Sequence, residues 1–491
     1  MNRSSGILMH ITSLPSPYGI GSLGREAYEF IDFLEAAGQK FWQVLPITPI
    51  GYGDSPYQSL STFAGNPLLI DLNLLREEGW LRTQDFEGID FGSNKEKVDY
   101  DKIFQNKLPL LRKVFFRGKE KYKDKIADFR QKHQGWLEDY GLYMALKFHF
   151  NLKAWYQWEE GIKLRRESAI AGYKKKLKGE MDYWIFLQYL FYHQWEALKK
   201  YANSKGIKMI GDLPIYVAED SVDTWASSEI FLLDAKKKPL QVAGCPPDAF
   251  SKSGQLWGNP LYRWEVLEKR GFDWWIERIA GSRRLYDVIR LDHFRGLESF
   301  WAVPYGEKTA EGGTWMKGPG MKLLKAIKEK LGKVDVIVED LGFLTSEVIA
   351  LREESGYPGM KVLQFAFDPG EESIYLPHNY VKNCVVYTGT HDNDTVMGWR
   401  QSENQKNIKF ARQYLKLDEE EGYHWGFIRG AWSSVANLAV APLQDFIGLS
   451  SEGRMNIPST VGGNWRWRVK KEYLTEELSK KIYAITKLYY R

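Results

Sequence analysis

Four acidic residues lie where an apolar, strand-like run gives way to polar residues: Asp212, Asp292, Glu339 and Asp392. An acidic residue after a strand can simply cap the next helix. Four such residues, each with polar neighbours, point instead to a shared site. Carboxyl groups in pairs cleave glycosidic bonds, because one protonates the leaving oxygen while the other takes or stabilises the sugar carbon. The residue types therefore predict glycoside chemistry at these positions.

The neighbours of these residues suggest a role for each. Arg290 precedes Asp292 by two residues, so both side chains leave the same face of a strand. A guanidinium so close lowers the pKa of the aspartate, which suits a nucleophile. Glu339 follows the apolar run 336–338, where desolvation raises the pKa and suits a proton donor. Asp392 is left as a third carboxylate, which could bind sugar hydroxyls.

Some of the residues around the carboxylates also allow a purely structural interpretation. Arg290 and Asp292 could form a purely structural ion pair. The two histidines next to the acidic residues, His293 and His391, could be ordinary hydrogen-bonded side chains as readily as sugar ligands.

Eight short β-rich runs, most of them followed by an amphipathic helical stretch, must position the carboxylates. Their near-continuous apolar character is typical of buried parallel strands, and the intervening helices supply right-handed crossovers. Eight βα units predict an α/β fold of the TIM (β/α)8 barrel type, whose strand ends converge on the face that carries active sites. We expect the strands at residues 6–14, 41–47, 208–217, 288–296, 334–342, 360–367, 384–392 and 437–443.

The spacing of these runs is uneven and predicts large insertions in one catalytic barrel that spans residues 1–491. Between strands two and three we expect an insertion of one or more subdomains at residues 48–182. Between strands three and four we expect a second insertion at 218–287, which includes a Pro-, Gly- and Ser-rich loop at 244–262. Loops this long in a compact domain usually carry function, so we expect an active-site lid there.

A glycine-rich motif, Gly19–Gly24, formally matches the G-x-G-x-x-G pattern of dinucleotide-binding folds. The first glycine of that pattern should leave the strand directly, but residues 15–18 intervene. The second strand also ends without the acidic residue that binds a ribose. We interpret the segment as a loop at the barrel mouth and expect no nucleotide cofactor.

Composition argues against several classes of protein. The 491 residues carry 68 Lys+Arg and 63 Asp+Glu, a net charge of +5, and the window 101–130 holds 10 basic and 4 acidic residues. A solvated helix surface explains that window better than a nucleic-acid face. No apolar run reaches the roughly 18 residues of a membrane helix, and the first residues do not resemble a secretory leader. With two cysteines, Cys245 and Cys384, we expect a cytoplasmic protein without nucleic-acid or membrane partners.

Several longer motifs, taken together, resemble the 4-α-glucanotransferases, also called amylomaltases, a branch of the α-amylase-like barrels. They are GYGDSPYQ, GDLPIYV, GCPPDAFSKSGQLWGNPLY, VIRLDHFRG, VIVEDLG, GTHDN and GNWRWR, and the similarity runs from Ile7 to Arg468. The resemblance implies a retaining enzyme without a cofactor or a metal. Such an enzyme cuts an α-1,4-glucan, holds the glycosyl group on an aspartate and passes it to another sugar.

The resemblance also implies roles for individual residues. It assigns the nucleophile to Asp292, the acid/base to Glu339 and the transition-state carboxylate to Asp392, in agreement with the roles inferred from their neighbours. It further implies that glucose units contact Ser55, Tyr57, Asp212, Gln255, Trp257, Arg290, His293, Asp368, His391 and Asn464.

Transfer and hydrolysis share one covalent intermediate and differ in whether a sugar hydroxyl or water resolves it. A lid that excludes water and rings that hold an acceptor favour transfer. We expect Phe250 and Trp257 to belong to the lid, and Tyr52, Tyr57 and Trp257 to supply the rings. Spacing alone does not separate the two reactions, so the choice of a transferase rests on the resemblance. The implied partners are maltooligosaccharides, starch or glycogen-type α-1,4-glucans, and glucose as acceptor. The alternatives are an α-amylase-type hydrolase and a non-enzymatic glucan-binding protein.

Overall fold

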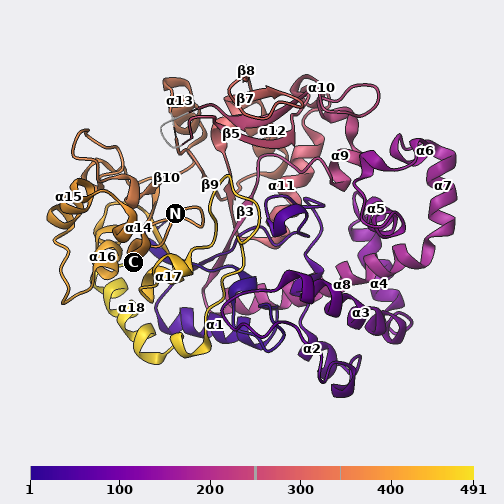
Figure 1. Ribbon diagram of the computed structural model, residues 1–491, viewed down its shortest axis with the longest axis horizontal. Helices are drawn as coiled ribbons and strands as arrows, with labels where there is room; N and C mark the ends of the chain where they lie inside the picture. Colours follow the sequence, from indigo (N-terminus) through magenta and orange to yellow (C-terminus); the bar gives the residue numbers. More distant parts are fainter. Residues whose placement is uncertain (1, 248–250, 343) are drawn as a thin grey trace.

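The eight predicted strands form a closed parallel barrel. In the computed structural model, which describes residues 2–247, 251–342 and 344–491, their order is β1-β12-β11-β10-β9-β6-β3-β2 (Figure 1). The TIM-barrel prediction is therefore confirmed, although several strands end earlier than expected. They are β1 (Ser4–Leu8), β2 (Phe41–Gln43), β3 (Lys208–Leu213), β6 (Val288–Leu291), β9 (Val336–Val338), β10 (Gly359–Val362), β11 (Cys384–Tyr387) and β12 (Leu438–Pro442).

The barrel closes between its first and its last strand. β1 pairs with β12 in parallel register, from Ser4 opposite Leu438 to Leu8 opposite Pro442. Every residue of both strands is buried, because side chains fill the barrel interior and helices cover the outside. β1 also needs a glycine beside β2, since a Cβ on Gly6 would lie 2.7 Å from the Cβ of Phe41.

Residues between β2 and β3 build a helical unit beside the barrel, on the right of Figure 1. α5 (Leu137–His149) packs against the long α8 (Lys178–Ser204). Gly141 allows this close approach, because a Cβ there would lie 2.9 Å from Ile185. The other helices of this unit are α2 (Leu72–Glu77), α3 (Tyr100–Gly118), α4 (Lys123–Lys132), α6 (Glu160–Lys163) and α7 (Glu167–Lys176).

The basic window at residues 101–130 covers most of α3 and α4, and part of its charge is paired. Arg112 donates to both carboxylate oxygens of Glu180, at 2.7 and 2.8 Å, and Arg117 forms an equivalent two-point contact with Asp85. Arg112 therefore links α3 to α8, and Arg117 links α3 to the turn at residues 83–85.

A second, antiparallel sheet lies outside the barrel and corrects one expectation. Its order is β5-β4-β7-β8, so much of the segment 244–262, expected as a lid loop, forms strands. The sheet also takes up chain that follows β6, beyond the expected insertion at 218–287. Residues 248–250 of the expected lid, including Phe250, lie outside the described residues. The strands are β4 (Gln241–Cys245), β5 (Gln255–Pro260), β7 (Ser299–Pro304) and β8 (Thr314–Lys317).

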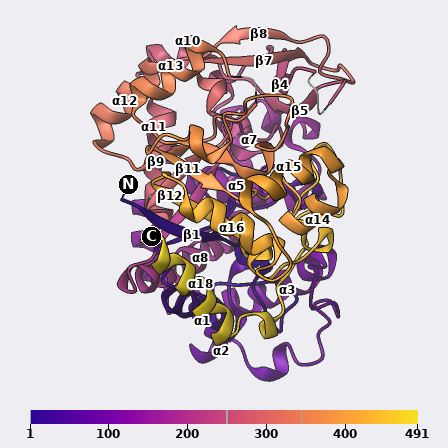
Figure 2. The ribbon, with the colours of Figure 1, turned by 90° about the vertical axis from the view of Figure 1, so that its left-hand side faces the viewer.

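Helices on the outside of the barrel connect the strands. α1 (Arg25–Ala36), from the start of the chain, packs against α18 (Glu476–Leu488), from its end (Figure 2). No helix in the described ranges is long and apolar enough to cross a membrane. The remaining helices are α9 (Val222–Ala226), α10 (Trp264–Lys269), α11 (Asp273–Leu285), α12 (Met321–Leu331), α13 (Ser346–Ser355), α14 (Val396–Ser402), α15 (Gln405–Leu415), α16 (Tyr423–Ser433) and α17 (Leu443–Phe446).

The glycine-rich segment Gly19–Gly24 ends at the N-cap of α1, as a nucleotide-binding loop would. The space at that helix terminus is filled by Asp71. A Cβ on Gly24 would lie 2.2 Å from its carboxylate, and Ser22 Oγ donates to Asp71 Oδ2 at 2.7 Å. Because a buried carboxylate lies against this turn and would repel a phosphate, the geometry favours the interpretation as a barrel-mouth loop.

Candidate active site

The four predicted carboxylates come from the carboxyl ends of barrel strands. Asp212 lies in β3, Asp292 directly follows β6 and Glu339 directly follows β9, and these three strands are neighbours in the barrel. Asp392 lies beyond the end of β11, which stops at Tyr387 and not at residue 392 as predicted. Three carboxylates therefore leave adjacent strands, and a loop carries the fourth.

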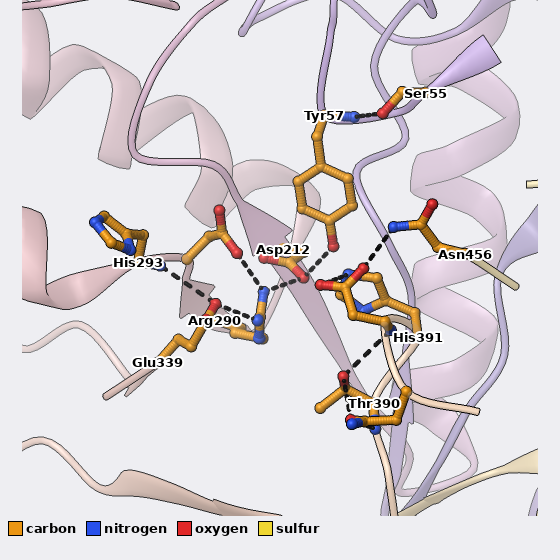
Figure 3. A network of polar contacts seen from close by, with 12 residues as sticks. Ser55, Tyr57, Asp212, Arg290, His293, Glu339, Thr390, His391 and Asn456 are labelled. Atoms are coloured by element: carbon orange, nitrogen blue, oxygen red, sulfur yellow. Dashed lines mark hydrogen bonds and ion pairs between the residues drawn. The ribbon is translucent and has the colours of Figure 1, made fainter. Parts of the chain in front are cut away.

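Arg290, in β6, contacts three of these carboxylates (Figure 3). Its Nη1 donates to Asp212 Oδ2 at 2.5 Å and to Asp292 Oδ1 at 3.1 Å, and its Nη2 donates to Glu339 Oε2 at 2.5 Å. The side chain of Arg290 is 3% exposed, against 25% for Asp292 and 21% for Glu339. A buried guanidinium thus holds the carboxyl groups together, while Asp292 and Glu339 remain accessible to a ligand.

This shared contact contradicts the predicted pKa pattern. Burial and then the charge of Glu339 raise the pKa of Asp292, and Arg290 does not compensate for them. Burial also acts to raise the pKa of Glu339, but Arg290 and other contacts outweigh it and lower that pKa below its usual range. The prediction was wrong because only Asp292 is close to Arg290 in the sequence. In the fold, Glu339 makes the shorter contact with the guanidinium, and the two carboxyl groups titrate as a pair.

Tyr57 links Asp212 to the fourth carboxylate. Its hydroxyl donates to Asp212 Oδ2 at 2.8 Å, and its ring stacks on His391 with centroids 5.1 Å apart. His391 Nε2 in turn lies 3.5 Å from Asp392 Oδ2. Polar and aromatic contacts therefore run without a break from Arg290 to Asp392.

A second group of predicted residues connects the antiparallel sheet to the carboxylates. On β5, Trp257 Nε1 donates to Gln255 Oε1 at 3.2 Å, and its indole meets the His293 ring edge to face at 4.7 Å. The backbone N–H of His293 donates to Glu339 Oε2 at 3.3 Å, from a left-handed conformation with φ of 48°. Burial lowers the pKa of His293 to about 4, so its imidazole is neutral at pH 7.

Of three further predicted sugar contacts, Ser55 touches this network through the backbone of Tyr57, and Asp368 and Asn464 lie outside it. Ser55 Oγ accepts the backbone N–H of Tyr57 at 3.2 Å. Asp368 is exposed and accepts a backbone N–H of its own turn at 2.8 Å. The amide of Asn464 is used within the loop 457–464, where it accepts one hydrogen bond at 3.1 Å and donates another at 2.9 Å. A role for these three side chains in binding sugar stays a prediction.

Sequence reasoning missed a segment near the end of the chain that frames Asp392. Asn456 Nδ2 donates to Asp392 Oδ1 at 2.7 Å, and Arg454 Nη2 donates to the backbone oxygen of Asp392 at 3.0 Å. The side chain of Asp392 is 47% exposed, so these contacts orient it without enclosing it. The nearest sequence signal was the GNWRWR motif at residues 463–468, which identified the region but not these two residues.

Two cavities flank the network. One is lined by Tyr57 and Asp212, among others, and the other by His391 and Asn393. Within the part of the chain that the structure describes, no group of three or more His, Cys, Asp or Glu side chains could hold a metal ion. Each cavity has one carboxylate, one guanidinium and at least one aromatic ring in its lining, and neither lining includes Asp292 or Glu339. Carboxylates and aromatic rings suit the hydroxyls and the faces of a sugar.

Comparison with known proteins agrees with this chemistry. The family model described as 4-alpha-glucanotransferase matches residues 9–475. A 4-alpha-glucanotransferase of Clostridium butyricum is 54% identical over 485 residues, which cover 98% of this chain and 100% of the relative. An amylomaltase of Streptococcus agalactiae, solved in complex with acarbose, is 44% identical with a TM-score of 0.97, and the match covers 100% of this chain and 99% of that one. An amylomaltase of Corynebacterium glutamicum, 18% identical with a TM-score of 0.80 over 99% of this chain and 75% of its own, shares the fold. The chain therefore belongs to the 4-alpha-glucanotransferase family.

Proposed function

We propose that the protein transfers a segment of an α-1,4-glucan to the 4-hydroxyl of glucose or of a maltooligosaccharide, through a covalent glycosyl-Asp292 intermediate. The observation that carries this mechanism is the contact of Asp292 and Glu339 with one buried guanidinium. Retaining enzymes hold their two carboxyl groups about 5–5.5 Å apart, and inverting enzymes about 6.5–9.5 Å. Two carboxyl groups that both contact Arg290 support the closer spacing of the retaining reaction.

Each half of the reaction forms one bond to the anomeric carbon and breaks another. First, the carboxylate of Asp292 attacks that carbon, the bond to the glycosidic oxygen breaks, and Glu339 gives its proton to this oxygen. The shortened glucan then leaves with a free 4-hydroxyl. Next, the 4-hydroxyl of the acceptor attacks the same carbon, Glu339 takes its proton, and the bond to Asp292 breaks. Two inversions restore the α configuration, while Asp392 binds sugar hydroxyls more strongly as the ring flattens.

One proton shared by two carboxyl groups is enough to start this cycle. Burial and the negative charge of Glu339 raise the pKa of Asp292, so the pair retains a proton more readily than two separate carboxyl groups would. Attack on the sugar requires this proton on Glu339 and a negative charge on Asp292. Because both groups contact one guanidinium, the proton can settle on Glu339 as the glycosidic oxygen approaches. The total charge of the pair does not change, so this step needs no proton from solvent.

We infer that a sugar, and not water, is the usual acceptor. The names of the relatives support a transferase, and the acarbose complex of the Streptococcus agalactiae amylomaltase supports ligands of the maltooligosaccharide class. Starch and glycogen-type α-1,4-glucans are longer donors of the same chemistry. Tyr57 and Trp257 offer ring faces beside the carboxylates for such chains. An α-amylase-type hydrolase would use the same carboxylates, so products must distinguish the two.

Incubation of the purified protein with maltotriose tests the reaction. A transferase converts maltotriose into glucose and a ladder of longer oligosaccharides. A hydrolase gives only shorter sugars, and a glucan-binding protein without activity gives no product. Either of the last two results would refute the proposed reaction.

Three variants test the mechanism. Asp292→Asn and Glu339→Gln should each lose nearly all transfer from maltotriose, whereas Asp335→Asn, an ion-paired residue just before β9, should not. With α-glucosyl fluoride, whose leaving group needs no proton, Glu339→Gln should accumulate a glucosyl ester that peptide mass spectrometry locates on Asp292. A wild-type rate in Asp292→Asn, or an ester on any other residue, would contradict the assignment.

A further inference from the structure

Trp465 adopts a backbone conformation that is unfavourable for its side chain. Its φ of 64° lies in the left-handed region, where a bulky residue is an outlier. The residue is nevertheless 5% exposed and well packed. Such a conformation persists only where its surroundings enforce it, and it is frequent beside functional sites.

Hydrogen bonds on both sides of the residue enforce the conformation. The N–H of Trp465 donates to the carbonyl of Met455 at 2.7 Å, and its own carbonyl accepts the hydroxyl of Tyr100 at 2.9 Å. One residue further on, the carbonyl of Arg466 accepts the N–H of Val98 at 2.7 Å. The segment is therefore fixed both to its own loop and to the start of α3.

The indole of Trp465 completes a cluster of three rings at the site. Its centroid lies 5.6 Å from Tyr57 at an interplanar angle of 41°, and 5.9 Å from His391 at 39°. Tyr57 and His391 stack on each other at 15°. Each of these two rings also reaches a carboxylate, since Tyr57 donates to Asp212 and His391 lies beside Asp392.

We propose that Trp465 is a positioning residue: its ring, held in place by the left-handed backbone, fixes the Tyr57–His391 pair. This inference rests on the proposed function of the site. Gly462 and Gly463, which lie three and two residues before Trp465, also have positive φ, of 80° and 77°. A third glycine would have met the backbone requirement without strain. The presence of a tryptophan there is explained by the need for its ring.

Substitutions at Trp465 separate the backbone from the ring. Trp465→Phe keeps an aromatic ring, Trp465→Ala removes it, and Trp465→Gly removes it and also relieves the left-handed strain. We expect kcat on maltotriose, per folded enzyme, to fall about a hundredfold in the Ala and Gly variants, with KM within about threefold, and to fall far less in Trp465→Phe. Trp465→Gly should melt at a higher temperature than Trp465→Ala and yet be equally impaired.

Trp425→Ala is the matched control. Trp425 is 4% exposed, close to the 5% of Trp465, but its indole packs on Phe446 at the outside of the barrel. That variant should melt earlier while its kcat per folded enzyme stays within about threefold of wild type. If Trp465→Ala behaves in the same way, Trp465 only stabilises the fold and the proposal is wrong.

Two further measurements test whether Trp465 affects catalysis through His391. If Trp465 acts through His391, the double variant Trp465→Ala/His391→Ala should be hardly slower than His391→Ala, whereas independent effects would multiply. The imidazole NMR signal of His391 should move in Trp465→Ala and stay in place in Trp425→Ala, and an unmoved signal would overturn the proposal. The NMR signal does not depend on catalysis. Failure of the proposed reaction would be seen when wild type does not elongate maltotriose, and it can therefore be told apart from failure of the positioning role of Trp465.

Discussion

Replacing Arg290 with methionine would remove the guanidinium that contacts Asp212, Asp292 and Glu339. Methionine fills much of the same volume, so the main change is electrostatic. The side chain of Asp212 is fully buried, and the other two carboxyl groups are mostly buried. Without this cation, each carboxyl group would have to bind a proton or keep a buried negative charge that the guanidinium no longer compensates.

The burial of the three carboxyl groups determines how much the free energy of unfolding should fall. Removing one partner of a buried ion pair costs about 3–5 kcal/mol, because the other charge is left uncompensated. An unfolding entropy of about 2.1 cal/mol/K per residue gives about 1 kcal/mol/K for 491 residues. The melting temperature of Arg290→Met should therefore fall by about 3–5 °C at pH 7, and transfer activity should be lost.

The loss of stability in Arg290→Met should grow as the pH rises. Arg290 lowers the pKa of both Asp292 and Glu339, so its removal raises both in the folded protein. The unfolded carboxyl groups titrate near pH 4. Above that pH the folded variant binds more protons than the unfolded chain, so its free energy of unfolding falls as the pH rises. The difference in melting temperature from wild type should therefore widen between pH 5 and pH 8.

Differential scanning calorimetry over this pH range measures the effect. Arg3→Met serves as the control, because the guanidinium of Arg3 donates to three backbone carbonyl oxygens, at 2.7–2.8 Å, and its loss exposes no carboxylate pair. Its destabilisation should be the same at pH 5 and pH 8. If Arg290→Met shows the same flat profile, or melts within about 1 °C of wild type at pH 7, the electrostatic reasoning is refuted.

Three further changes have defined outcomes. Asn456→Ala removes the amide that donates to the half-exposed Asp392, so kcat on maltotriose should fall about tenfold, which equals about 1.4 kcal/mol. The melting temperature should not change. A kcat equal to that of wild type would contradict this prediction. Tyr57→Phe removes a donor from the buried Asp212, which should cost about 1–3 kcal/mol in calorimetry and also lower kcat/KM. Lys107 is buried against the carbonyl of Leu68, and burial lowers its pKa to about 8. Because the unfolded lysine keeps its proton to about pH 10.4, wild type should gain stability between pH 8 and pH 10, and Lys107→Met should lack this gain in melting curves.

The barrel could be predicted because its strands have a local signature. Each is a short, largely apolar run that is buried on both faces, and all eight predicted runs overlap a barrel strand. The antiparallel sheet has no such signature. β8 is exposed along its whole length, and β4 pairs with β7 through contacts such as Gln241 opposite Pro304, which no local pattern announces.

The site shows the same division between local and long-range information. The carboxylates could be predicted because strand ends of a parallel barrel converge on one face. Their protonation could not, because it depends on Glu339 reaching Arg290 from another strand. Asn456 and Trp465 escaped prediction because each acts through contacts with residues distant in the sequence.

The pairing of β1 with β12 has a consequence for the order of folding. While the chain is being synthesised, β1 has no partner on one of its edges until residues 438–442 have left the ribosome. The nascent barrel therefore keeps one unpaired strand edge until its last strand arrives, and such an edge can pair with another chain. Asn456 and Trp465 emerge later still. Catalysis thus becomes available only after the barrel has closed, so that an unfinished chain has no complete site.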